Sequence, residues 1–311
     1  MKSLKHGVEE YLNYRTSLGF TLIHDRLILN QFVSYMAKKR ATYVTCELAI
    51  AFSKLNPHAS RVRWAVRLAI IKRFTDYWKH IDPRTEALTQ CFGTSTYRRK
   101  TPYIFSANEI KKILICCIIS SSPYEVERYS YFIWFGLMAI TGMRTGEVAR
   151  LRRSDLNLKE GIITIHNSKF RKSRLIPLHK STTQALANYL IYRDRHITNV
   201  KTKSLFIDHS GVTLSAIRVR STFRALLIKT GIQRTPSGRP RLMDFRHTFA
   251  VNTLVRWHRR QVNIDQHILV LLTYLGHTHL RHTYWYITTT PKLLKLFGTR
   301  LNNNGGVLWE K

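Results

Sequence analysis

The sequence predicts a mainly α-helical protein with a small β-hairpin or sheet, an α+β fold in two domains. Apolar residues recur at spacings of three and four along most of the chain, which is the pattern of amphipathic helices. Two short β-rich runs between residues 161 and 178 flank a basic segment, as the strands of a hairpin do. A length of 311 residues is enough for two domains with separate cores.

The charge balance predicts the class of partner. Lys and Arg number 51 against 18 Asp and Glu, so the formal net charge is +33. This excess predicts a polyanionic partner, and its spread along the whole chain favours nucleic acid over a membrane surface. A merely basic protein without such a partner is the alternative.

The apolar segments bear on localisation. The longest nearly apolar stretch, residues 131–143, is too short to span a bilayer, and the N-terminus is charged where a signal peptide is apolar. We therefore expect a cytoplasmic protein with no membrane partner. The four cysteines form no CxxC pair and are interpreted as buried, reduced thiols.

Residues 1–85 are expected to form a small helical domain that binds DNA. Helical periodicity covers EEYLNYRTSLGF, RLILNQFVSYMAKK and SRVRWAVRLAIIKRFTDYWKH, with Gly19 and Pro57 at the breaks. Arg63 and Arg67 belong to a basic group on the last of these helices and are candidate phosphate contacts. A solvated surface is the alternative for each basic residue taken singly.

Residues 86–105 are expected to link the domains. Periodicity fades in this stretch, which is rich in Thr, Ser, Gly and Pro and ends in three basic residues that suit a phosphate backbone, Arg98, Arg99 and Lys100. The second domain, residues 106–301, begins at Ser106, which forms a capping box with Glu109 for a helix over residues 107–119. Residues 302–311 are expected to be a flexible tail.

The second domain then alternates helix, hairpin and helix. YSYFIWFGLMAI predicts a buried helix that Thr141-Gly142 ends, so that Arg144 opens the next helix. GIITIH and SRLIPL predict the hairpin, whose basic tip contains Lys169, Arg171 and Lys172. Helices are expected over residues 181–195 and 215–229, and the second carries three arginines that suit a DNA groove or phosphates, Arg218, Arg220 and Arg224.

The candidate catalytic residues lie in two stretches, MDFRHTFAV (residues 243–251) and YLGHTHLRHTYWY (residues 274–286). Arg246 lies in a predicted helix, His277 follows a Leu-Gly break, and Tyr286 comes nine residues later. These three side chains can converge on one phosphate. Arginine offers a planar fork that matches two phosphate oxygens, and a tyrosine hydroxyl can act as a covalent nucleophile.

These motifs carry a family resemblance. R-H-T-F-A, then L-G-H and Tyr286, with T-G-M-R-T-G-E-V-A-R-L upstream, resemble the tyrosine recombinase (phage integrase-like) family over about residues 106–301. The opening YLNYRTSLGF is similar to the start of that family's core-binding domain. The resemblance implies a core-binding domain followed by a catalytic domain, and DNA cut and rejoined through a 3′-phosphotyrosine without metal or cofactor.

The resemblance also implies the role of each residue. Tyr286 would be the nucleophile, and Arg144, Arg246 and His277 would neutralise charge on the phosphate. Lys169, placed by its position ahead of K-S-R-L-I-P-L, would protonate the leaving 5′ oxygen.

Further residues have alternative or supporting roles in the same comparison. Lys172 is the alternative to Lys169 if the register differs, and Tyr284 is a less favoured nucleophile than Tyr286. Glu147 would support the first arginine of the site, and His247 is interpreted as structural.

One position departs from the family pattern. The second arginine usually belongs to H-x-x-R, whereas this chain has Met243-Asp-Phe-Arg246. Methionine can neither bind phosphate nor take a proton, so activity is expected to be weakened or to need a partner subunit. Help in removing the tyrosine proton would come from Lys169, from water or from the positive field of Arg144 and Arg246.

The expected partner is double-stranded DNA with inverted-repeat core sites, on which the protein assembles as a dimer to tetramer, alone or with other recombinases. YWYITTTPKLL also resembles a subgroup found in mobile elements, so integration, excision or transposition is the expected process. The last helix, residues 291–301, would dock on a neighbouring protomer or pack on its own domain.

Three alternatives remain. A catalytically impaired DNA-binding paralogue would act with partner recombinases, and a basic RNA-binding protein would need no Tyr286. The histidines His277, His279 and His282 could hold a metal, although no Cys or carboxylate joins them at ligand spacing.

Overall fold

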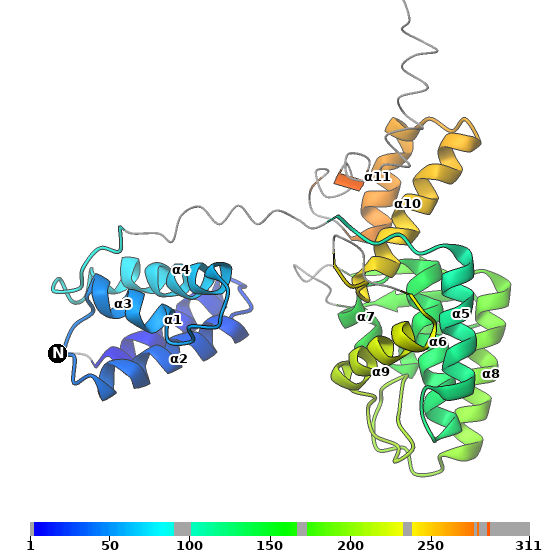
Figure 1. Cartoon of the computed structure of the whole chain (residues 1–311), viewed down its shortest axis with the longest axis horizontal. Helices are drawn as coiled ribbons and strands as arrows, with labels where there is room; N and C mark the ends of the chain where they lie inside the picture. The colour runs from blue at the N-terminus through cyan, green and yellow to red at the C-terminus, as the bar shows by residue number, and fades with distance from the viewer. Residues whose placement is uncertain are drawn as a thin grey trace, which may run out of the picture. The chain divides into compact units, whose positions relative to one another are not determined.

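The computed structural model describes residues 3–89, 101–166, 173–232, 238–276, 279 and 285–286. The chain divides into two compact units, Met1–Arg99 and Lys100–Lys311, each described by itself (Figure 1). Most described residues are helical and a small antiparallel sheet joins them, so the predicted fold class is confirmed. No helix in the described part of the chain is long and apolar enough to cross a bilayer.

The described residues of the first unit form four helices: α1 Leu4–Ser17, α2 Ile23–Lys38, α3 Cys46–Ser53 and α4 Arg61–Trp78. Their buried faces meet in one core, which includes Leu12, Phe32 and Phe74. Packing continues past residue 85, the predicted end of the domain. Leu88 is buried in this core, and the carboxylate of Glu86 accepts the backbone N–H of Cys46 at 2.7 Å.

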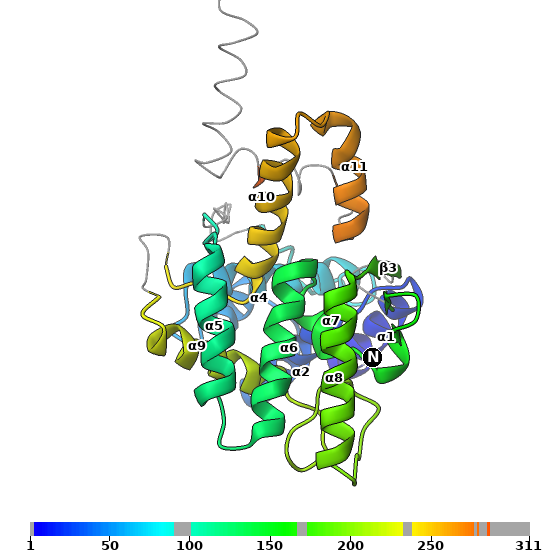
Figure 2. The ribbon, with the colours of Figure 1, turned by 90° about the vertical axis from the view of Figure 1, so that its right-hand side faces the viewer.

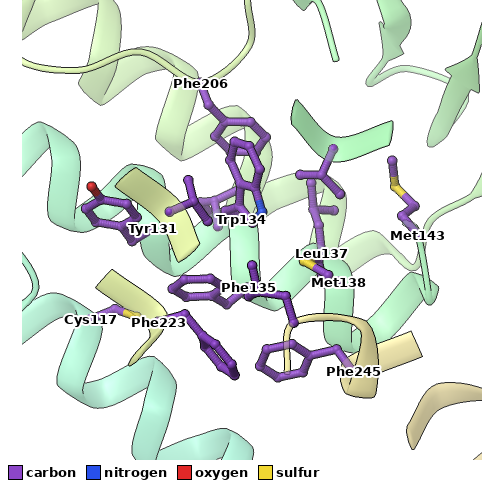
Figure 3. Packing of buried hydrophobic residues seen from close by; sticks show 14 of the residues in the cluster. Cys117, Tyr131, Trp134, Phe135, Leu137, Met138, Met143, Phe206, Phe223 and Phe245 are labelled. Atoms are coloured by element: carbon purple, nitrogen blue, oxygen red, sulfur yellow. The ribbon is translucent and has the colours of Figure 1, made fainter. Parts of the chain in front are cut away.

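The second unit is built around a buried central helix, α6 (Glu125–Thr141), which packs against α5 (Ala107–Ser120), α8 (Lys180–His196) and α10 (Met243–Arg259) (Figure 2). The remaining described helices are α7 Thr145–Ala149, the 3-10 turn Arg153–Asp155, α9 Ala216–Lys229 and α11 Ile264–Leu275. Ser106 and Glu109 form the predicted capping box at α5. Trp134 and Phe135 on α6 pack with Phe223 and Phe245 in the main core (Figure 3).

The sheet contains the predicted hairpin and one more strand. β2 (Ile162–Ile165) pairs antiparallel with β3 (Arg174–Pro177), and β1 (Leu156–Asn157) pairs on the other side of β2. Sequence reasoning missed β1, because two residues are too few to show an alternating pattern. The basic tip with Lys169, Arg171 and Lys172 lies outside the described residues.

Helices α10 and α11 form a pair that carries a smaller core of its own. Val251 and Leu254 of α10 meet Leu271 and Leu275 of α11, and Tyr286 is buried in the same cluster. Figure 1 and Figure 2 both show this pair extending from one end of α6 and its neighbours. The pair therefore positions the predicted nucleophile.

Candidate active site

Glu147 is the centre of the buried ionic network. Its side chain is only 1% exposed and accepts the backbone N–H of Arg144 at 2.9 Å and the Arg144 Nη1 at 2.8 Å. Burial alone would raise the pKa of this carboxyl, but hydrogen bonds and charge from Arg174, with further hydrogen bonds from Arg144, lower the pKa to about 2. The predicted support of Arg144 by Glu147 is thus present as a direct ion pair.

Arg174 is the member of this network that sequence reasoning missed. Its guanidinium reaches Glu147 with two nitrogens, at 3.0 and 2.7 Å, and its Nε donates to the Tyr274 carbonyl at 2.8 Å. Arg174 was noticed only as part of K-S-R-L-I-P-L. No local signal in the sequence pairs Arg174 with Glu147, because the two residues are 27 positions apart.

Two glycines bring the arginines together. Gly142 ends α6 with φ +62°, and Gly276 follows α11 with φ +64°, a region that side-chain-bearing residues rarely adopt. A Cβ on Gly276 would lie 3.1 Å from Nη1 of Arg174. Arg144 donates to the Gly276 carbonyl at 2.9 Å. The T-G and L-G breaks are therefore places where two motifs touch.

Arg246 is the most deeply buried charge of the site. It is 2% exposed, and it donates to the carbonyl of Gly142 at 2.9 Å and to that of Leu275. Burial, followed by the nearby charge of Arg144, lowers the pKa of Arg246 to about 10, while the charge of Tyr286 acts in the opposite direction. Arg246 and Tyr286 are thus close enough for their charges to interact, and a positive Arg246 would favour the ionised form of Tyr286.

The cluster has an excess of positive charge. Arg144 and Arg174 both pair with the carboxylate of Glu147, whereas the nearby Arg246 donates to backbone carbonyls. A phosphate bound at this cluster would therefore be stabilised by guanidinium donors that the fold already holds in place and largely shields from water. The arrangement can stabilise negative charge that develops on phosphoryl oxygens.

Tyr286 contacts His247 next to the arginine cluster. The side chain of Tyr286 is 2% exposed, and its hydroxyl lies 3.3 Å from Nδ1 of His247. His247 was expected to have a structural role, and the structure places its ring in contact with the predicted nucleophile.

Met243 is the first residue of α10 and lies at a basic groove. It is 37% exposed. The groove has a volume of about 640 Å³, and its lining includes Thr145 and four arginines, Arg220, Arg224, Arg239 and Arg241. Two of the arginines predicted to contact DNA, Arg220 and Arg224, therefore share a surface with the substituted position.

The other predicted DNA contacts have different surroundings. Arg218 pairs with Glu127 at 2.9 Å and with Asp208 at 3.0 Å, so its charge is used within the fold. Arg67 stacks on the Phe52 ring at 4.3 Å, and Arg63 is exposed. The remaining predicted site residues, whose placement the structure leaves undescribed, are Lys169, His277, Arg98, Arg99, Lys100, Arg171 and Lys172.

The three-histidine metal alternative is also undecided, because His277 and His282 lie outside the described residues. Among the described residues no group of three His, Cys, Asp or Glu side chains could hold a metal ion.

Comparisons with known proteins identify the family of this chain. The model of the phage integrase family matches residues 104–292. A protein of Sinorhizobium fredii named "Putative integrase/recombinase y4rB" is 33% identical over 315 residues, which cover 100% of this chain and 99% of that protein.

Solved structures share the fold at low sequence identity. The Tn1549 transposon integrase in complex with transposon right end DNA matches with a TM-score of 0.65 and 14% identity, over 97% of this chain and 99% of that chain. A lambda integrase dimer bound to a COC′ core site matches with a TM-score of 0.61 and 15% identity, over 100% and 80% of the two chains. The family match and the similarity to y4rB over the whole of this chain show that the chain belongs to the phage integrase family, the tyrosine-type site-specific recombinases.

Proposed function

We propose that this protein cuts and rejoins DNA at specific sites through a covalent 3′-phosphotyrosine at Tyr286. The observation that carries this proposal is the buried Tyr286 hydroxyl, which lies 3.3 Å from Nδ1 of His247 in the same helix pair that carries the buried Arg246. A nucleophile, a proton acceptor and excess positive charge are the three requirements of phosphoryl transfer to a tyrosine.

The bond changes follow from these positions. The Tyr286 oxygen forms a bond to phosphorus, the bond from phosphorus to the 5′ oxygen breaks, and that oxygen takes a proton. Arg144 and Arg246 stabilise the negative charge on the non-bridging phosphate oxygens in the transition state. By their motif positions, His277 adds a third donor and Lys169 supplies the proton. The phosphodiester energy is retained in the tyrosyl ester, so rejoining needs no cofactor.

The substrate of this proposal is double-stranded DNA with inverted-repeat core sites, bound by a dimer that assembles to a tetramer. The basic groove with Arg220 and Arg224 and the exposed Arg63 of the first unit suit its phosphates. The similar solved structures hold transposon-end and core-site DNA, which supports integration or transposition of a mobile element as the process.

The test is covalent capture of DNA. The protein is incubated with nicked duplexes made from the ends of its own genetic element, and the products are resolved on a denaturing gel. We expect a covalent protein–DNA band with the natural protein and none with Tyr286→Phe. A band that survives in Tyr286→Phe, or no band with any duplex that the protein binds, would contradict the proposal.

A second candidate is a DNA-binding paralogue that has lost catalysis. The observation in its favour is Met243, which lies in the groove where the family pattern has histidine. If Met243→His alone formed the covalent band, the natural protein would be a binder that borrows or lacks this group. If the natural protein forms the band, methionine is tolerated.

A further inference from the structure

We infer that His247 is the group that takes the proton of Tyr286, and that Asp244 positions its ring, so that this chain replaces the missing histidine at position 243. The inference rests on the proposed function, because it concerns how the same nucleophile is activated. It assigns chemistry to a residue that the motif comparison treats as structural.

The two ring nitrogens of His247 face different groups. Nδ1 lies 3.3 Å from the Tyr286 hydroxyl, within hydrogen-bond reach, and Nε2 lies 3.9 Å from Oδ1 of Asp244. With the proton on Nε2, Nδ1 is the acceptor that a phenol requires. The ring thus lies between the nucleophile and a carboxylate.

Asp244 is itself held in place. It is 1% exposed and accepts the backbone N–H of Arg241 at 2.7 Å and the Arg241 Nη2 at 3.0 Å. Asp244 and His247 are three residues apart on α10, so they share one face of the helix. A carboxylate fixed in this way favours the positive imidazolium that forms when His247 gains a proton.

The replacement is geometrically simple. Positions 243 and 247 are four residues apart in α10, on the same face and one turn from each other. Met243 is 37% exposed at the groove, whereas the side chain of His247 is only 15% exposed and its ring also packs against Trp285. The proposed proton acceptor is therefore one helical turn from position 243, at a less exposed residue that contacts the nucleophile.

The Tyr286 hydroxyl gives its proton to Nδ1 of His247, and the resulting phenolate oxygen forms a bond to phosphorus. As in the proposed function, the bond from phosphorus to the 5′ oxygen then breaks and that oxygen takes a proton. The imidazolium is stabilised by Asp244, and Arg246 stabilises the phenolate. In the rejoining step the 5′ hydroxyl loses its proton and its oxygen bonds to phosphorus, the bond from phosphorus to the tyrosine oxygen breaks, and Nδ1 returns the proton to that departing oxygen.

The experiment measures the rate of covalent complex formation by the full-length protein with His247→Gln. Glutamine keeps a polar side chain but cannot act as a base. We expect the rate to fall about a hundredfold or more, the usual contribution of a positioned base. The exposed His267 on α11 provides the matched control, because its ring contacts Trp257 and its Nδ1 lies 2.9 Å from the Asn263 carbonyl oxygen. DNA affinity and the thermal unfolding midpoint are measured for each variant.

A second substrate distinguishes a role of His247 as the base for Tyr286 from a role as the acid for the leaving group. In this substrate p-nitrophenol replaces the 5′-linked strand as the leaving group, and it departs without needing a proton. The defect of His247→Gln should persist on this substrate, since tyrosine must still lose its proton. A defect that disappears would show that His247 serves the leaving group, which would overturn the inference.

The pH dependence gives the third readout. The charged and titratable groups that contact His247 include Asp244, which is itself paired with Arg241, and Tyr286. The natural protein should lose rate towards low pH as histidine is protonated. This limb should be absent in His247→Gln and displaced in Asp244→Asn, a change that a merely structural role would not produce.

The outcomes separate the inference from the proposed function. If Tyr286→Phe abolishes the band while His247→Gln forms it at the natural rate with the same pH profile, the recombinase stands and the inference fails. If His247→Gln binds DNA and melts like the natural protein but reacts slowly on both substrates, the inference holds. A band that appears only with Met243→His would also overturn it.

Discussion

Replacing Glu147 by Gln removes the one carboxylate that Arg144 and Arg174 share, while the size of the side chain stays nearly the same. Glu147 is 1% exposed and receives hydrogen bonds from both arginines at 2.7 to 3.0 Å. Without its charge the two guanidiniums lose their common partner beside the buried Arg246. We expect the second unit to lose stability and the site to lose its geometry.

The magnitude follows from the pKa of this carboxyl. The fall from 4.5 to about 2 corresponds to about 3 kcal/mol of stabilisation of the charged form, at about 1.4 kcal/mol per pH unit. Removing one partner of a buried ion pair typically costs about 3–5 kcal/mol, which is the same range. Because the pKa is lower in the folded state, this stabilisation is fully present above pH 4.5 and is lost as the pH falls towards 2.

The assay is urea unfolding followed by far-ultraviolet circular dichroism at neutral pH and along an acid series. Glu147→Gln should lower the free energy of unfolding by about 3 kcal/mol at neutral pH and should remove part of the acid dependence between pH 4.5 and 2. The exposed Glu160 supplies the control Glu160→Gln, which should change little. A loss below about 1 kcal/mol, or an unchanged acid profile, would refute the ion-pair reasoning.

Two further predictions concern the glycine contact and the basic helix. Gly276→Ala should destabilise the protein by about 1–2 kcal/mol more than Gly19→Ala, because both glycines have a positive φ but only a Cβ at position 276 would lie 3.1 Å from Arg174. Urea unfolding of the two variants measures this difference in stability. Equal losses would show that the contact with Arg174 relaxes. Arg220→Ala should weaken duplex binding and reduce its salt dependence by about one counter-ion, with stability unchanged, as salt titrations of binding would show. Arg218→Ala should instead lower the free energy of unfolding by about 2 kcal/mol, because it loses the ion pairs with Glu127 and Asp208. The reverse pattern would contradict the assignment.

The elements of the fold were predictable because each depends on neighbours in the chain. Ser106 and Glu109 are three residues apart and cap α5 as expected. Gly142 ends α6 because it can adopt a positive φ, which places Arg144 at the start of α7. The hairpin was evident from its β-rich runs, but the two-residue β1 was not, since so short a strand has no pattern of its own.

The site was predicted only where a motif names its residues. Arg144, Glu147, Arg246 and Tyr286 were found in this way, and the ion pair of the first two lies within one turn of helix. Arg174 was missed, because its bond to Glu147 joins residues 27 apart, across β3 and α7. His247 was recognised but given a structural role, because nothing in its neighbourhood in the chain shows what its ring faces.

The sequence by itself determined the helical class, the hairpin, the positive charge and the identity of the motif residues, since all of these are local or compositional. Only the tertiary structure decided which charges are neutralised within the fold, as with Arg218, and which side chain meets Tyr286. The pairing of Tyr286 with His247 spans 39 residues and depends on how α10 packs against α11 in the small core that buries the tyrosine. Contacts of this kind follow from packing directions in three dimensions, which periodicity along the chain does not specify.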